Sequence, residues 1–139
     1  MYEELKEQIK LHEGYRLEAY NCTEGFLTGG YGHKILDGEH IPSTKEGWSK
    51  VFEDDFLRSL EGAKRIIDFD TIHPKAQAVC IEAVFVLGVR GFSCFKRTLQ
   101  HLKEGSYSMA SKELKDSLWF KKQATNRVQA LCNILEAIK

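Results

Sequence analysis

HEGYRLEAYNCTEGFLTGGYGH, residues 12–33, is the stretch that decides the fold of this chain. Four glycines in its second half, at positions 25, 29, 30 and 32, are too many for a helix. Earlier in the stretch, apolar Leu17 and Ala19 alternate with charged Arg16 and Glu18, which is the two-residue period of a strand. The stretch therefore predicts a small antiparallel hairpin or three-stranded sheet with tight turns.

Helical patterns lie on both sides of this segment. A short amphipathic helix is predicted over 2–12 and a long one over about 45–67. Pro74 opens a helix over about 74–88 that is apolar nearly all round, so we expect it to be the buried central helix. Further helices are predicted over about 92–103, 106–118 and 125–138.

The predicted fold class is α+β, mostly α. A small antiparallel β-hairpin lobe covers about 13–42, and a helical lobe covers about 60–139 together with the first helix. A chain of 139 residues is long enough for one domain with its own core, so we expect a single domain over 1–139. A junction between two lobes is where ligands bind, and a cleft is expected there.

Charge is unevenly distributed along a chain whose formal net charge is zero. Residues 1–60 hold 7 Lys and Arg against 12 Asp and Glu, and residues 61–139 hold 13 against 8. This asymmetry is either a chance dipole or a basic second half that faces a polyanion, with carboxylate chemistry in the first half. No basic patch interleaved with aromatic residues is present, so nucleic acid is not an expected partner.

The four cysteines lie at positions 22, 80, 94 and 132 and form no C-x-x-C pair. No histidine cluster has zinc spacing, so neither a metal nor another cofactor is expected. The pattern indicates reduced thiols in a reducing compartment. The first residues lack the pattern of a signal peptide, and no apolar run approaches the ~20 residues that span a bilayer. We expect no stable membrane insertion, and we expect a monomer.

Glu13, Cys22 and Thr28 can face one another across the mouth of the predicted hairpin. Residues 12–33 resemble the catalytic segment of the T-even bacteriophage lysozyme family, the phage endolysins. In that family Glu, eight residues, usually Asp, five residues and Thr are followed by Gly-x-Gly-His. The match continues at residues 85–88, 117–120 and 126–127, so the resemblance runs along most of the chain.

The resemblance implies a lysozyme-like fold and a muramidase. Such an enzyme hydrolyses the β-1,4 bond between N-acetylmuramic acid and N-acetylglucosamine in bacterial peptidoglycan. It implies Glu13 as the proton donor, and partial burial in a cleft is expected to keep a proton on such a carboxyl. It also implies that Thr28 holds the attacking water, although strands favour threonine in any case.

Cys22 departs from the family, which usually has an aspartate at this position. Either the thiol replaces the carboxylate, as a thiolate or as a polar group that holds water with Thr28, or it is an inert turn cysteine. If it is inert, Glu13 can act alone as in a lytic transglycosylase, where the sugar's own hydroxyl attacks. A third alternative is a lysozyme-like module that binds the cell wall or a partner without cutting.

Other positions take roles only through the resemblance. His33 and Asp55 match a buried structural pair that ties the sheet to the long helix. Arg127 matches an arginine that reaches toward the glutamate, and a solvated arginine is the alternative. Sugar contacts are implied at four further positions: Lys34, Phe85, Thr98 and Glu113. Of these, Lys34 and Glu113 differ in residue type from the family's usual choices, and Phe85 also fits a core position.

Biologically, the resemblance implies lysis of a host cell by a phage. The enzyme would wait in the host cytoplasm and reach the cell wall after release by a holin. Peptidoglycan is the expected partner.

Overall fold

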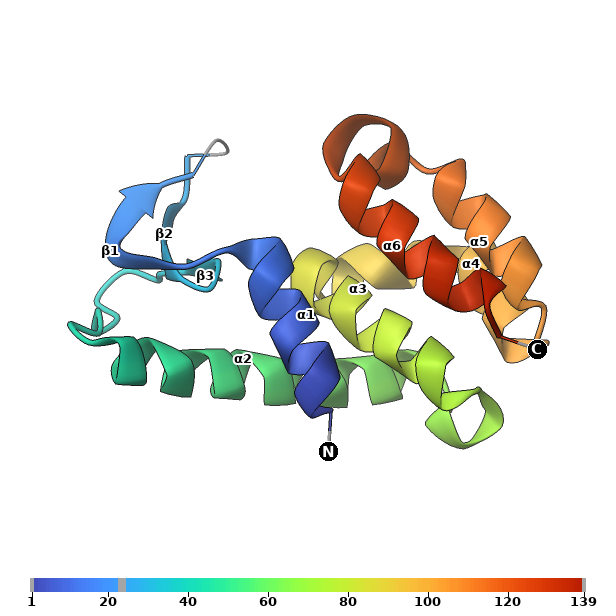
Figure 1. Ribbon diagram of the computed structural model, residues 1–139, viewed down its shortest axis with the longest axis horizontal. Coiled ribbons are helices and arrows are strands. Elements are labelled where there is room, and N and C mark those ends of the chain that lie inside the picture. Colours follow the sequence, from blue (N-terminus) through green and yellow to red (C-terminus); the bar gives the residue numbers. More distant parts are fainter. Residues whose placement is uncertain (1, 23–24, 139) are drawn as a thin grey trace. The chain divides into compact units, whose positions relative to one another are not determined.

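A computed structural model describes residues 2–22 and 25–138 of the chain. Thr23 and Glu24, which belong to the turn predicted from the sequence, lie outside the described residues. The chain divides into two compact units, Met1–Arg58 and Ser59–Lys139, and the boundary falls within one long helix, α2 (Lys45–Ile66). The elements follow one another in the order drawn in Figure 1.

The first unit opens with α1 (Glu3–Glu13), which buries Leu5 and Ile9. The helix ends where Gly14 adopts a positive φ of 74°, a conformation that glycine reaches without a steric penalty. Both ends lie one residue later than the predicted helix over 2–12. This small shift makes Glu13 the last residue of α1. The helix therefore fixes the backbone from which the Glu13 side chain extends.

A three-stranded antiparallel sheet follows, as the sequence predicted, in the order β1-β2-β3. Its strands are β1 (Arg16–Asn21), β2 (Leu27–Gly30) and β3 (His33–Lys34). Thr28 in the middle strand is paired with Tyr20 on one side and Lys34 on the other. The register of β1 on β2 shifts between Arg16 and Tyr20.

The glycines of β2 make room for an indole ring from α2. A Cβ atom on Gly29 would lie 2.6 Å from the Trp48 side chain, and one on Gly30 would lie 2.4 Å from it. The Trp48 indole N–H donates a hydrogen bond of 2.8 Å to the backbone oxygen of Leu17. The glycine-rich sequence therefore lets the sheet approach α2 closely, and Trp48 joins β1 to that helix.

The second unit is helical. After the end of α2 it contains the short turn η1 (Phe69–Thr71) and the helices α3 (Pro74–Ser93) and α4 (Lys96–Lys103). These are followed by α5 (Tyr107–Lys115), the π-helical turn η2 (Trp119–Gln123) and α6 (Thr125–Glu136). Figure 1 shows α5 and α6 side by side, and these two helices pack against each other.

The central helix α3 is interrupted at Gly88, whose φ of 77° and ψ of 168° are not helical. The predicted end of this helix at about 88 coincides with that break. The predicted start of the next helix at 92 is wrong, because the chain resumes a helical path directly after Gly88 and α4 begins only at Lys96. Glycine reaches this positive φ without the steric penalty that other residues meet, so Gly88 can interrupt the helix at this point.

Most buried side chains of α3 belong to the core of the second unit. By length and composition alone, α3 is also the one helix among the described residues that could cross a membrane, a property it shares with the core helices of soluble proteins. Eight of its residues are buried within the chain, and one of them is Glu82. The α+β, mostly helical class predicted from the sequence is confirmed.

Candidate active site

Glu13 lies at the end of α1 with its carboxylate against the turn between β2 and β3. A Cβ atom on Gly32 would lie only 2.3 Å from the Glu13 Oε1 atom, and Gly32 has a positive φ of 74°. Only glycine satisfies both constraints at this position. The last glycine of the Gly-x-Gly-His sequence therefore gives the Glu13 carboxylate its place on the hairpin, where the side chain is half-buried.

Thr28 and Cys22 meet at one carbonyl oxygen. The Thr28 hydroxyl donates a hydrogen bond of 3.0 Å to the backbone oxygen of Phe26, and the Cys22 backbone N–H donates one of 2.8 Å to the same oxygen. Thr28 is 4% exposed and Cys22 is half-buried. Because its proton is directed at Phe26, the Thr28 hydroxyl can offer a water only its oxygen, as an acceptor.

The structure thus brings Cys22 and Thr28 to a single backbone group and places Glu13 at the turn that follows β2. All three residues belong to the first unit, as their close sequence spacing suggested. Phe26 was not singled out from the sequence, since its role here comes from its carbonyl group, which every residue type has.

His33 lies between two carboxylates. Its Nδ1 atom is 2.6 Å from Asp55 Oδ2, and its Nε2 atom is 2.7 Å from Glu39 Oε2. Glu39 also accepts a hydrogen bond of 2.8 Å from the backbone N–H of Leu36, and Asp55 is bridged by Arg58. The structure therefore places the predicted pair of His33 and Asp55 in contact, and it adds Glu39 as a second partner.

The carboxylates favour the protonated imidazole. The hydrogen bond to Asp55 raises the pKa of His33, and Glu39 raises it further, although partial burial acts in the opposite direction. The pKa of Glu39 is lowered, first by the N–H of Leu36 and then by His33. Sequence reasoning missed Glu39 because an acidic residue in a polar loop carries no signal of its partner.

This network predicts a stability optimum in mildly acidic solution. A raised His33 pKa stabilises the fold fully below the unfolded value of about 6.5 and is lost as pH rises through the folded value. A lowered Glu39 pKa stabilises it above about 4.3 and is lost as pH falls through the folded value. Glu39→Gln is expected to lower the free energy of unfolding by about 1–2 kcal/mol near pH 6, and by less near pH 8.

Urea denaturation of the wild type and of Glu39→Gln across this pH range measures the difference. Asp37→Asn, in the same loop and exposed, is the matched control. A loss from Glu39→Gln that grows as pH rises from 6 to 8 would contradict an imidazolium held between carboxylates.

Lys34 is exposed on β3 directly beside Thr28. Its ammonium lies 4.6 Å from the centroid of the Phe26 ring, within the range of a cation–π contact. A position that the resemblance assigns to sugar contact is thus occupied here by a cation stacked on an aromatic ring next to Thr28.

Two of the residues predicted to contact the sugar lie in the second unit and line the same cavity. Thr98 on α4 is 3% exposed, and Glu113 on α5 is half-buried. Both line one open cavity of about 580 Å³, together with Phe95 and Trp119 among others. Phe85 lies half-buried on α3.

Arg127 in the first turn of α6 is held by a buried glutamate. Its Nε–H donates a hydrogen bond of 2.8 Å to Glu82 Oε2, and the two side chains are 12% and 0% exposed. The alternative of a solvated arginine is therefore wrong. Sequence reasoning missed Glu82, although an acidic residue within the apolar pattern of α3 was the signal for a buried pair.

Among the described residues, no group of three or more His, Cys, Asp or Glu side chains is arranged to hold a metal ion. The chemistry available to the described site is that of a carboxyl, a hydroxyl and a thiol.

A small sheet with a buried threonine in its middle strand and a helix-end glutamate against its second turn, followed in the chain by a helical unit, is the arrangement of a lysozyme-like glycosidase. The chain belongs to the phage lysozyme family, whose model matches residues 10–134.

Named relatives agree with this assignment. The chain is 26% identical to probable T4-type lysozyme 1 of Dictyostelium discoideum, over 98% of this chain and 95% of that protein. It is 29% identical to probable T4-type lysozyme 2 of the same organism, over 86% of each chain. It is 33% identical to an endolysin of Acyrthosiphon pisum secondary endosymbiont phage 1, over 76% of this chain and 70% of that protein.

Proposed function

We propose that this chain is a muramidase that hydrolyses the β-1,4 bond between N-acetylmuramic acid and N-acetylglucosamine in peptidoglycan. The observation that supports the proposal most is the Glu13 carboxylate packed on the Gly32 turn of the sheet that holds Thr28. Membership of the phage lysozyme family supports the same substrate. Action on a host cell wall, from the host cytoplasm after holin-mediated release, is part of this proposal.

Hydrolysis of a glycosidic bond needs a proton on the leaving oxygen and a water at the anomeric carbon. Glu13 gives its proton to the glycosidic oxygen as the bond from the anomeric carbon to that oxygen breaks. A water forms the new bond to the carbon and releases its proton to solvent. Thr28 accepts a hydrogen bond from this water, because its own proton is held by Phe26. The family resemblance implies inversion at the anomeric carbon.

Cys22 stands where the family usually places an aspartate, and this motivates a second candidate function. Without a carboxylate to orient water, the sugar's own 6-hydroxyl can attack, as in a lytic transglycosylase. Its products carry a 1,6-anhydro ring in place of a reducing end.

Mass analysis of muropeptides released from purified peptidoglycan tests the proposal. Hydrolysis adds one water to each fragment, so reducing-end products are expected. Anhydro products, lighter by one water, would replace the muramidase by the transglycosylase. If the folded protein releases no soluble fragments from peptidoglycan, the remaining function is that of a module that binds peptidoglycan or a partner without cutting.

Substitution of Cys22 tests whether the thiol has taken over the role of the aspartate. We expect Cys22→Val to lower the hydrolytic rate by about ten- to a hundredfold, because the variant has no polar side chain there to help position the attacking water. We expect Cys22→Asp to restore or raise the rate, because a carboxylate orients water more strongly than a thiol.

Initial rates on peptidoglycan suspensions, with melting temperatures of each variant, provide the measurement. Full activity of a stable Cys22→Val variant would show that the thiol is an inert turn residue. Activity that appears only in Cys22→Asp, with none in the parent, would identify the non-cutting module.

A further inference from the structure

An open cavity in the second unit is bounded by residues of α3, α4, α5 and η2. Its volume of about 580 Å³ is within the range of small-molecule sites. Phe95 and Trp119 form an aromatic wall of this cavity, since their rings meet edge to face with centroids 6.0 Å apart. All of its lining residues belong to the second unit, so that unit alone defines the cavity.

Thr98 contributes a buried hydroxyl to the cavity. It is among the lining residues although it is only 3% exposed, and its hydroxyl makes no hydrogen bond within the described part of the chain. A hydroxyl both donates and accepts hydrogen bonds, and its burial without a partner is costly. A polar ligand in the cavity supplies the partner that the chain itself does not.

Cys94 lines the same cavity and is the exposed one of the chain's four cysteines. Its Sγ atom donates a hydrogen bond of 3.4 Å to the backbone oxygen of Arg90, which orients the sulfur at the end of α3. Cys80 and Cys132 are buried, and burial raises the pKa of both thiols, that of Cys80 to about 12. Buried thiols of this kind are inert, whereas a group attached to the Cys94 sulfur lies at the cavity.

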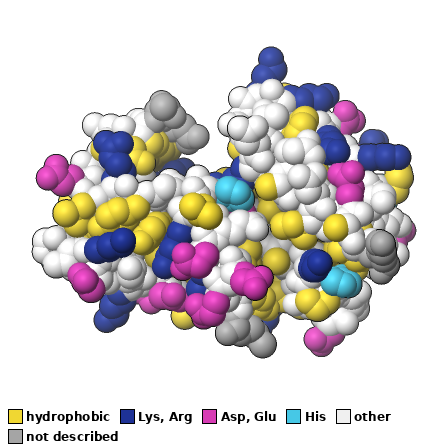
Figure 2. Space-filling model, in the orientation of Figure 1, with side chains coloured by type: hydrophobic (Ala, Val, Ile, Leu, Met, Phe, Trp, Pro, Cys, Tyr) yellow, Lys and Arg dark blue, Asp and Glu magenta, His cyan; other side chains and the backbone are white. Residues whose placement is uncertain are grey.

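Charges of both signs line the cavity together with this thiol. Lys96 and Arg97 extend from the first turn of α4, are exposed, and form no ion pair with any residue that the structure describes. Glu113 on α5 and Asp116 directly after that helix bring two carboxylates. Figure 2 shows further basic side chains gathered over η2. The lining is therefore complementary to a ligand that carries both carboxylates and an ammonium group.

We propose that Cys94 is a modification site for disulfides of small peptide thiols that carry carboxylate and ammonium groups, and that the attached peptide occupies this cavity. The Cys94 sulfur, as the thiolate, forms a bond with one sulfur of the disulfide, and the disulfide's own S–S bond breaks. The other half leaves as a thiolate and takes up the proton that Cys94 released. Cys94 is oxidised and the leaving half is reduced, so no further oxidant is needed.

Such a mixed disulfide is reversible and gives the chain a means of regulation. Thr98 and Glu113 are positions to which the resemblance assigns sugar contacts, and the attached peptide would cover them. Modification is therefore expected to lower the rate of peptidoglycan cleavage. This consequence rests on the proposed function, whereas the modification itself does not.

The test compares the reactions of the full chain with glutathione disulfide and with the uncharged bis(2-hydroxyethyl) disulfide. Intact mass measures the rate of adduct formation, and peptide mapping locates the adduct. Each rate is divided by that of N-acetylcysteine methylamide, which corrects for the intrinsic reactivity of the two reagents. We expect Cys94 to favour glutathione disulfide by about tenfold on this scale, and added salt to reduce the preference.

Two substitutions test the lining of the cavity. Lys96→Gln/Arg97→Gln should abolish the preference for glutathione disulfide, because the carboxylates of the reagent lose their partners. Thr98→Val keeps the shape of the side chain without its hydroxyl, and it should slow the reaction with glutathione disulfide alone by about two- to tenfold. If the double variant loses stability, Lys96→Arg/Arg97→Lys keeps both charges and should keep the preference.

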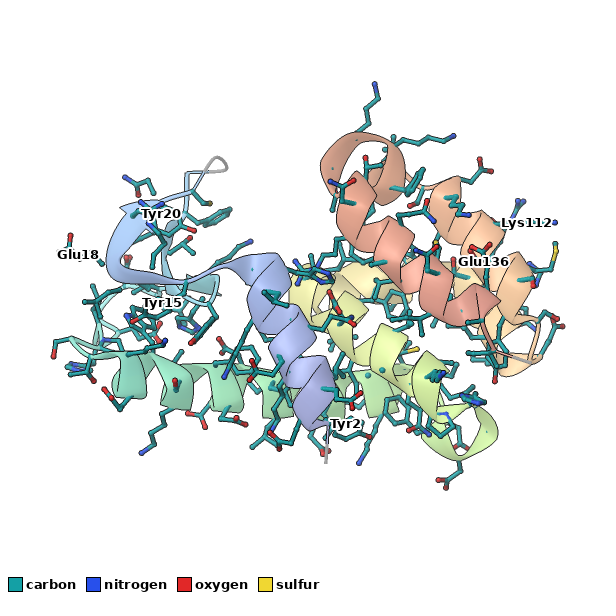
Figure 3. All side chains as sticks on the ribbon, in the orientation of Figure 1. Tyr2, Tyr15, Glu18, Tyr20, Lys112 and Glu136 are labelled. Carbon is teal, nitrogen blue, oxygen red and sulfur yellow. The ribbon has the colours of Figure 1, made fainter. Side chains whose placement is uncertain are left out.

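Lys103→Gln/Lys112→Gln is the matched control, because it removes the same amount of charge from α4 and α5 at exposed positions that do not line the cavity. Figure 3 shows Lys112 on the outer side of α5. This control should react as the wild type does.

An adduct that forms mainly at another cysteine, or a preference that survives in Lys96→Gln/Arg97→Gln, would overturn the proposal. Treatment that modifies Cys94 should lower the cleavage rate of the wild type and leave that of Cys94→Ser unchanged. Full cleavage activity of the completely modified wild type would overturn the regulatory role. Failure of the untreated chain to cleave peptidoglycan would contradict the muramidase function instead, and the adduct rates would still decide whether Cys94 is the modification site.

Discussion

Replacement of Glu13 by glutamine is expected to lower the rate of peptidoglycan cleavage by about a hundred- to ten-thousandfold, the range for a general acid. Glutamine has the shape of glutamate but no proton that it can give to the glycosidic oxygen. The glutamine side chain can still lie against Gly32, because it is no larger than the glutamate that packs there. The loss should therefore appear in kcat with little change in KM.

The measurement is the initial rate of muropeptide release, with the melting temperature as the test of folding. Because Glu13 is half-buried at a helix end, Glu13→Gln should change the free energy of unfolding by no more than about 1 kcal/mol. Glu18→Gln on the outer side of β1 is the matched control and should keep full activity. Retention of most activity by a folded Glu13→Gln variant would remove Glu13 from the role of acid.

Replacement of Arg127 by methionine is expected to lower the free energy of unfolding by about 3–5 kcal/mol, the cost of breaking a buried ion pair. The reason is the partner, Glu82, which is 0% exposed and loses the guanidinium at 2.8 Å. A carboxylate in the apolar interior of the second unit is costly when its countercharge is removed. Urea denaturation followed by circular dichroism measures the loss.

A double variant distinguishes the stability lost by leaving Glu82 without its countercharge from the stability lost by changing side-chain packing. Glu82→Met/Arg127→Met removes both charges and should recover most of the lost stability, since an apolar pair of similar volume often replaces a buried ion pair without loss. Lys121→Met, which breaks the exposed pair with Asp116, should change stability by less than about 0.5 kcal/mol. A double variant as unstable as the sum of its single changes would contradict this account.

The glycine-rich stretch predicted the small sheet because its pattern reflects local backbone requirements. Gly32 has a positive φ, and Gly29 and Gly30 lie where a Cβ would meet Trp48. Local rules also predicted the helices well, since their periodicity and the opening Pro74 depend on nearby residues. They failed at the start of α4, because a helix that resumes after Gly88 looks the same in sequence as a new helix.

The candidate site was predicted unevenly for a related reason. The spacing of Glu13, Cys22 and Thr28 lies within one supersecondary unit, so short-range sequence places these residues near one another. The hydrogen-bond partners Glu39 and Glu82 were missed, because nothing in the sequence around a carboxylate indicates which histidine or arginine it will contact. The stacking of Lys34 on Phe26 beside Thr28 was not recognised for the same reason.

The sequence by itself determined the fold class, the family and the residues on which the proposed chemistry rests. Each of these follows from residue types at short spacing, which act through backbone conformation and periodicity. Only the tertiary structure decided which side chains meet: His33 with Glu39, Arg127 with Glu82, and Lys34 with Phe26. Most of these contacts join different segments, and their energies depend on distance and burial, which are properties of the folded chain.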